Sequence, residues 1–163
     1  MIGGPTLVDP DAARAAARRE IETGPHQDDP QFRAWRGAAP GEPRLVHDPR
    51  GHPAYWLVPV QRKGTTIGAV RVLASGRAAA FIAYRTGSDL LTLNSTEILE
   101  QARSAIAEHR GERPGAVLLV HDGPPGREAW RVEVLSDDRV VRWIFVTPSG
   151  VYQRAPPSVR LDL

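Results

Sequence analysis

Two His-Asp pairs are the residues of this chain best suited to chemistry. His47-Asp48 and His121-Asp122 stand 74 positions apart, and each pair follows Leu-Val. Imidazole and carboxylate groups can bind a metal ion or move a proton, and His52 would add an imidazole beside the first pair. The alternative is structural, because Asp begins turns well and Pro or Gly follows both pairs. A metal site normally needs three converging ligands, so we favour the turn and predict no bound metal, with His47, His52 and His121 as the candidates if one binds.

Covalent catalysis finds little support in the sequence. Cysteine is absent, which excludes disulfides, thiol catalysis and Cys-ligated metal. No G-x-S-x-G motif occurs, and neither Ser75 nor Ser149 has a histidine or an acid beside it in sequence. We therefore predict a protein that is not an enzyme and needs no cofactor. A hydrolase whose serine, histidine and acid converge from separate segments is the least favoured of the functions considered.

Aromatic residues supply the candidate partner-binding positions. Phe32 and Trp35 lie three apart, with Arg33 between them, in a segment rich in Pro, Gly, Asp and Arg. This segment is either a mobile recognition segment, in which Trp35 contributes little to stability, or an anchor that pins a long loop onto its own core. Tyr55 lies on the outer face of an expected strand, and Trp143 has no aromatic counterpart 74 positions earlier. We predict Phe32, Arg33, Trp35, Tyr55 and Trp143 as partner-binding residues.

The chain matches itself at a constant offset of 74. Residues 45–76 align without a gap to residues 119–150, and Trp56-x-Val58-x-Val60 returns as Trp130-x-Val132-x-Val134. A self-match of this kind indicates one structural unit present twice. Because strand side chains alternate between faces, each Trp shares a face with two valines, an arrangement typical of core packing. Tyr55 and Arg131 would then point to solvent or to a partner.

Each unit should begin with a helix and continue with strands. Asp9 is the expected N-cap of the first helix, with Gly24 at its end, and Asn94 with Glu97 forms a capping box for the second helix. Alternating strands follow, with hairpin turns at Lys63-Gly64 and Asp137-Asp138. We predict an α+β fold made of two tandem repeats, each with one helix packed on a three- to four-stranded antiparallel sheet.

The predicted organisation divides the chain into three parts. Repeat 1 covers residues 1–86 with an insert at about 25–43, repeat 2 covers residues 87–154, and residues 155–163 form an extended C-terminal tail. The two repeats should pack into one compact body.

Residues 129–134 (Ala-Trp-Arg-Val-Glu-Val), 140–146 and 148–152 resemble the PepSY domain. The resemblance covers most of residues 95–154 and, less well, residues 10–84. It implies a cystatin-like helix-on-sheet domain of bacterial envelope and secreted proteins, often found beside peptidases and taken to bind or restrain them. The family has no catalytic residues to carry over.

Charge and hydropathy limit the possible partners. The net charge of +2 is too small to favour nucleic acid, and no apolar run is long enough to cross a bilayer. No secretory signal is visible at Met1, and we expect an extracytoplasmic or envelope location if a signal or anchor has been removed. The oligomeric state is open.

These observations favour a protein that binds another protein or a peptide. The partner would bind either by strand addition at a sheet edge or through the segment that holds Phe32 and Trp35. The alternative is a small-molecule or metal-binding domain with a pocket between helix and sheet. That pocket would be lined by Trp56, Trp130 or the pair of His47 and His121.

Overall fold

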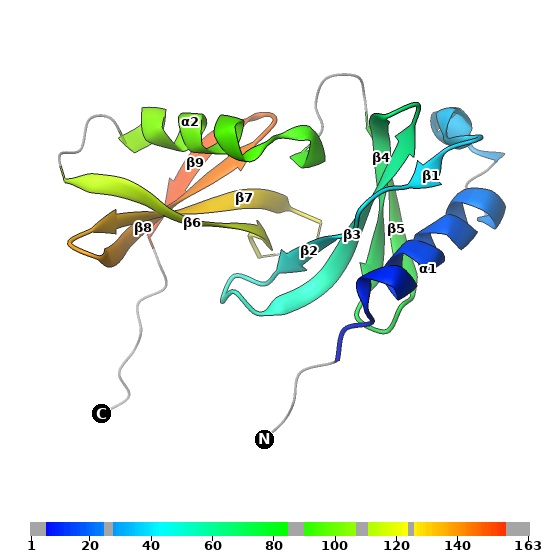
Figure 1. Cartoon of the computed structure of the whole chain (residues 1–163), viewed down its shortest axis with the longest axis horizontal. Coiled ribbons are helices and arrows are strands. Elements are labelled where there is room, and N and C mark those ends of the chain that lie inside the picture. Colours follow the sequence, from blue (N-terminus) through cyan, green and yellow to red (C-terminus); the bar gives the residue numbers. More distant parts are fainter. Residues whose placement is uncertain (1–5, 25–27, 85–89, 107–110, 124–125, 156–163) are drawn as a thin grey trace.

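The computed structural model describes residues 6–24, 28–84, 90–106, 111–123 and 126–155. The strands of this part of the chain form one sheet (Figure 1). The elements are, in order, α1 (Pro10–Thr23), η2 (Pro30–Trp35), β1 (Ala39–Pro40), β2 (Arg44–His47), β3 (Pro53–Arg62), β4 (Thr65–Leu73), β5 (Ala78–Ala83), η3 (Leu90–Thr92), α2 (Ser95–Ile106), β6 (Glu112–His121), β7 (Glu128–Ser136), β8 (Arg139–Thr147) and β9 (Gly150–Arg154).

The sheet has nine strands in the order β5-β4-β3-β2-β6-β7-β8-β9, and β1 pairs with β3 beside this path. All neighbouring strands are antiparallel except β2 and β6, which are parallel where His47 pairs with Val120. This parallel pair joins a first half, from α1 to β5, to a second half, from η3 to β9. The two halves are therefore parts of one sheet.

The predicted fold of two tandem α+β repeats of cystatin-like type, each with its own antiparallel sheet, is wrong. The strands form one large mixed sheet in which helices are few. The physical reason is that an edge strand carries unpaired backbone groups, and β2 and β6 satisfy theirs by pairing with each other. The predicted boundary at residue 86 and the tail beyond residue 155 lie outside the described residues.

The two helices lie on opposite faces of the sheet (Figure 1). α1 packs on a first-half core formed by Val58, Val60, Val70 and Val72. α2 packs on a second-half core formed by Val132, Val134, Ile144 and Val146. Trp130 packs against the α2 core and also against the cluster that contains Tyr55 and Leu57, which alternate with the valines of β3. α2 therefore occupies the face that α1 leaves open.

Capping defines the helices as the sequence predicts. The Asp9 carboxylate accepts a hydrogen bond from the N–H of Ala12 at 2.8 Å, and the Gly24 N–H donates to the Glu20 carbonyl. At α2 the Asn94 N–H donates to Glu97 Oε2, and the Glu97 N–H donates to Asn94 Oδ1, both at 2.9 Å. The predicted capping box is thus confirmed.

The two predicted hairpin turns are also confirmed. Lys63 and Gly64 have φ angles of 51° and 77°, and Asp137 and Asp138 have 49° and 59°. Positive φ at both central residues is the conformation that two-residue hairpins adopt, because its twist matches that of the strands. These turns fix the register of β3 with β4 and of β7 with β8.

The segment with Phe32 and Trp35 forms η2 and belongs to the first-half core. Trp35 is 2% exposed, and its ring lies edge-to-face against Phe32 at a centroid distance of 4.8 Å. A Cβ on Gly68 would come within 2.7 Å of the Trp35 ring, so the indole lies directly on the β4 backbone. Of the two interpretations offered by the sequence, the structure supports the second, in which this segment is an anchor that pins a long loop onto its own core.

Candidate functional site at the junction of the two halves

Three side chains form a buried hydrogen-bonded cluster across the junction. Tyr55 of β3 donates its phenol O–H to Glu128 Oε1 at 2.8 Å. Arg71 of β4 donates to the same oxygen through Nε at 3.2 Å and Nη2 at 2.8 Å. The side chains of Arg71 and Glu128 are 13% and 6% exposed, so little water screens the ion pair. The first half supplies the donors and the second half supplies the acceptor.

Burial and the neighbouring carboxylate determine the protonation states of Tyr55 and Arg71. Burial, and then the charge and the hydrogen bond of Glu128, raise the pKa of Tyr55 well above its ordinary value. Burial opposes the charge on Arg71, but the hydrogen bonds and charge of Glu128 outweigh it and raise the pKa of the guanidinium. Tyr55 therefore stays neutral, and the Glu128 carboxylate is held in one orientation by two donor groups.

Two cavities open beside Glu128, and together we call them the junction groove. One of about 340 Å³ is lined by Leu57, Ile82, Tyr84, Leu90, Gly126, Arg127, Glu128, Pro148 and Ser149. The other, of about 490 Å³, is lined by Asp122, Arg127, Glu128, Thr147, Pro148, Ser149, Gly150, Val151 and Tyr152. Four residues line both cavities: Arg127, Glu128, Pro148 and Ser149. The groove thus extends from β5 across the junction to β9.

Asp122 organises the far end of the groove. Its Oδ2 accepts hydrogen bonds from the Tyr152 hydroxyl at 2.7 Å and from Arg127 Nη2 at 3.0 Å, and it lies 3.2 Å from Arg154 Nη2. Burial, followed by the hydrogen bond to Asp122, raises the pKa of Tyr152 to about 12. Two guanidinium groups thus face one buried carboxylate at this end of the groove.

The three candidate histidines have separate surroundings. His47 Nδ1 lies 3.1 Å from the Leu119 carbonyl, His121 stacks on the Tyr55 ring at 5.9 Å, and His52 Nδ1 lies 3.4 Å from Asp48 Oδ2. His47 is in register with Val120, so it and His121 lie on opposite faces of the sheet. Within the described ranges, no three His, Cys, Asp or Glu side chains are grouped to hold a metal ion.

The two His-Asp pairs differ in what their aspartates do. Asp48 Oδ1 accepts hydrogen bonds from the N–H groups of Arg50 and His52, both at 2.9 Å, which is the turn that the sequence favours. Asp122 instead binds side chains of the groove. Ser149 Oγ lies 3.0 Å from Thr147 Oγ1, and the hydrogen bonds of the described chain connect it to no histidine.

Tyr55 and Arg131 do not point outward as the strand alternation predicts. Tyr55 is 4% exposed and Arg131 is 6% exposed. The expectation assumed that only the helix-covered face is buried, whereas the junction covers Tyr55 and the turn at Pro49 covers Arg131. The Pro49 carbonyl accepts a hydrogen bond from Arg131 Nη1 at 3.0 Å, and the Trp143 ring lies 4.3 Å from the guanidinium.

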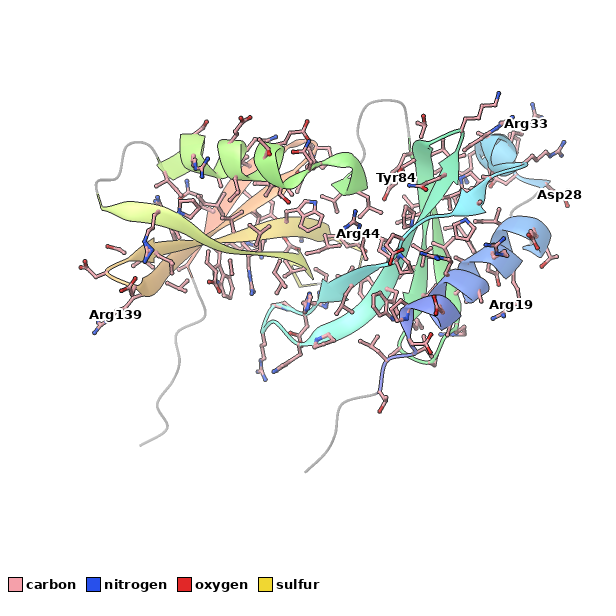
Figure 2. All side chains as sticks on the ribbon, in the orientation of Figure 1. Arg19, Asp28, Arg33, Arg44, Tyr84 and Arg139 are labelled. Carbon is pink, nitrogen blue, oxygen red and sulfur yellow. The ribbon has the colours of Figure 1, made fainter. Side chains whose placement is uncertain are left out.

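The other predicted partner-binding residues are scattered. Phe32 and Trp35 are buried against α1, and Arg33 is exposed at the outer end of the first half (Figure 2). Trp143 is half-buried on the sheet face that α2 does not cover. None of these residues lines the junction groove, although Phe32 and Trp35 line a separate cavity of about 420 Å³ near the end of α1.

Sequence reasoning did not single out Arg71 or Glu128. Arg71 interrupts an apolar strand between Val70 and Val72, and this was the available signal for a buried charge. No sequence pattern indicates its partner, because Glu128 belongs to the other half and comes close to Arg71 through the pairing of β2 with β6.

Comparison with protein-family models, with curated proteins and with solved structures found no match. The resemblance to PepSY domains therefore stays a prediction. No helix of the described chain has the length and apolar character needed to span a membrane.

Proposed function

We propose that this protein is a non-enzymatic binding module that captures an extended segment of a protein or peptide by strand addition at β5. The observation that carries the proposal is the character of this terminal strand. β5 reads Ala-Ala-Ala-Phe-Ile-Ala, with no charged residue and no proline. Natural sheets usually protect their edges with charges, prolines or bulges, because an unprotected edge pairs with other chains.

β5 has a bulge at its beginning, where its pairing with β4 skips Ala79, and from Ala80 to Ala83 its backbone offers a regular set of donors and acceptors. The Tyr84 N–H donates to the Ile67 carbonyl at 3.0 Å, and the pairing continues in register to Ala83 with Gly68 and Ile82 with Ala69. In an antiparallel pair, residues alternate between bonding the partner strand and pointing away from it. Ala83, which lies between Ile82 and Tyr84, therefore directs its N–H and C=O groups away from β4, on the side where no described strand pairs with β5.

The opposite edge of the sheet is less suited to this role. β9 has five residues and ends in Gln153 and Arg154, both exposed. Arg154 also binds Asp122, which ties its side chain to the groove. Because a charge on an edge strand opposes pairing, we place partner binding at β5.

The decisive test is a substitution that removes one outward N–H from β5. Ala83→Pro deletes this donor without touching the bonds to β4, and Ala83→Val keeps the donor while changing the side chain. A library of random linear peptides displayed on phage is selected on the natural chain, and enriched peptides are then titrated against both variants. We expect Ala83→Pro to weaken binding by about fivefold to tenfold and Ala83→Val to weaken it less.

Hydrogen exchange gives an independent readout of the same proposal. A strand added at β5 should slow amide exchange at Ala83, whose donor it would occupy. Circular dichroism of both variants verifies that they fold. Equal affinity of the peptides for the two variants, or the failure of any peptide to be enriched, would overturn strand addition.

The peptidase-restraining role and envelope location that the PepSY resemblance implies stay predictions beside this proposal.

A further inference from the structure

We infer that the 340 Å³ cavity of the junction groove recognises one side chain of the partner segment, an aromatic side chain with a hydrogen-bond donor at its tip. Of the three large aromatic residues, tyrosine and tryptophan carry such a donor and phenylalanine does not. The inference rests on the proposed strand addition, and it names the partner sequence that the strand would select.

The position of this side chain follows from the geometry of β5. Ile82 lies between Phe81 and Ala83, and it lines the cavity together with Tyr84. Ile82 and Tyr84 pack towards Leu57, whereas Phe81 and Ala83 pack towards α1. In adjacent strands, residues directly opposite each other have side chains on the same face. The partner residue opposite Ile82 therefore points into the cavity, and its two neighbours point to the α1 side.

The walls of the cavity suit a side chain that is apolar along its body and polar at its tip. Its lining includes three apolar residues, Leu57, Ile82 and Leu90, and two polar ones, Glu128 and Ser149. A volume of about 340 Å³ is at the lower end for small-molecule sites. This size fits one large side chain better than a whole ligand molecule.

Glu128 has an oxygen available for the tip of that side chain. Tyr55 and Arg71 both donate to Oε1, and Oε2 makes no hydrogen bond to any described residue. The carboxylate is already oriented by these donors, so ligand binding would cost little further conformational entropy at this side chain. Tyr55 itself demonstrates that a phenol is a suitable donor to this carboxylate.

The charges around Glu128 favour a neutral donor over a cation. Arg71 balances the carboxylate, and Arg127, which also lines the cavity, shares the single carboxylate of Asp122 with Arg154, so the groove carries an excess of positive charge. A lysine or arginine tip would meet a net positive charge, and an acidic tip would meet Glu128. A phenol O–H or an indole N–H satisfies Oε2 without either conflict, and phenylalanine lacks the donor.

The ligand side of the test uses the peptides whose binding depends on the Ala83 donor. We expect tyrosine or tryptophan to recur at one position of these peptides. Synthetic peptides carrying Tyr, Trp, Phe or Lys at that position are then titrated by fluorescence anisotropy. Replacing Tyr by Phe should weaken binding by about threefold to tenfold, because Oε2 loses its donor, and Lys should bind more weakly still.

The protein side of the test has a matched control within the chain. Ser149 is exposed in the turn between β8 and β9 and lines both cavities, so Ser149→Phe should fill the polar end of the groove. Ser75 is the exposed residue 74 positions earlier, in the turn between β4 and β5, and lines none of the three cavities. Ser149→Phe should weaken the Tyr peptide at least about fivefold, and Ser75→Phe should leave its affinity unchanged.

The outcomes separate this inference from the proposed function. Peptides that require the Ala83 donor but show no preference at the position opposite Ile82 would overturn the aromatic pocket and leave strand addition standing. Equal affinities for Tyr and Phe, or equal effects of Ser149→Phe and Ser75→Phe, would do the same. Failure to obtain any peptide that depends on Ala83 would overturn both. The exchange of Tyr for Phe is made in the peptide, so it needs no folded variant.

Discussion

The two halves of the sheet carry similar residues on one face and different residues on the other. On the helix-covered faces, residues 74 positions apart are the same or similar: Trp56 and Trp130, Val58 and Val132, Val60 and Val134, Val70 and Ile144, Val72 and Val146. On the opposite faces the matched residues are Tyr55 and Ala129, Leu57 and Arg131, Ala69 and Trp143, Arg71 and Phe145. Packing against a helix restricts one face to close-fitting apolar side chains, and the other face is free to vary.

The variable faces have different coverings. In the first half, η3 and the second half cover Leu57 and Ala69, and the covering leaves the cavity beside β5. In the second half no described helix covers the face, and the aromatic residues cover one another. Phe145 stacks on Tyr152 at 4.9 Å, and Trp143 lies against Arg131. The cavity beside β5 thus arises where the two halves meet, because residues of both halves line it.

The largest effect should come from the aromatic anchor that only the first half has. Trp35→Ala should lower the free energy of unfolding by about 3–5 kcal/mol, because the indole is buried between α1, β4 and Phe32. Trp143→Ala, at a half-buried position of the second half, should cost about 1–2 kcal/mol. Urea denaturation measures both. Equal costs would show that η2 is not part of the core and would restore the mobile recognition segment.

A smaller effect should come from the ion pair that connects the halves. Glu128→Gln should destabilise the protein by about 2 kcal/mol, because Arg71 remains buried without a charged partner. Glu42→Gln is the control, since it removes the exposed pair with Arg14 and should cost less than about 0.5 kcal/mol. Denaturation in urea compares the two. A cost for Glu128→Gln no greater than that of the control would mean that the junction does not depend on this pair.

Local structure was predictable from the sequence where a few neighbouring residues determine it. The Asn94 and Glu97 capping box and the hairpin at Asp137-Asp138 form as expected, because each depends only on the residues of one turn. The alternation that buries Val58 and Val132 is likewise visible in the sequence. These features specify the strands and helices but not how the two halves combine.

The candidate site was not predictable for a physical reason. It depends on the parallel pairing of His47 with Val120, residues from distant segments whose contact no local pattern encodes. That pairing brings Glu128 to Tyr55 and Arg71, and it buries the face of β3 expected to be exposed. An alternating strand indicates that one face is buried, and it cannot exclude burial of the second face by a distant segment.

A matched substitution can test why the variable faces differ. Arg131→Leu gives β7 the residue that β3 has at the equivalent position, Leu57. Burial lowers the pKa of Arg131, its Nε makes no hydrogen bond among the described residues, and no described carboxylate is within salt-bridge distance. Because a buried unpaired cation is costly, the substitution should stabilise the protein by about 1 kcal/mol.

The control for this prediction is Arg139→Leu at an exposed position of the second half, which should change stability by less than about 0.5 kcal/mol. Thermal and urea denaturation compare the two variants. A loss of stability in Arg131→Leu larger than that of the control would contradict the argument. It would mean that the contacts of the guanidinium with Pro49 and Trp143 outweigh the cost of its burial.

A further difference between the halves should appear only at alkaline pH. An ordinary tyrosine has a pKa of about 10, so a folded-state pKa of about 12 at Tyr152 gives a stabilisation that is complete below about pH 10 and is lost as the pH rises through about 12. Tyr152→Phe should therefore reduce the loss of stability over this interval. Tyr55, more deeply buried beside Glu128, should ionise after Tyr152. Ultraviolet titration of tyrosinate in Tyr152→Phe and Tyr55→Phe assigns the two steps, and ionisation of Tyr55 first would mean that the junction opens before the groove end at Asp122 does.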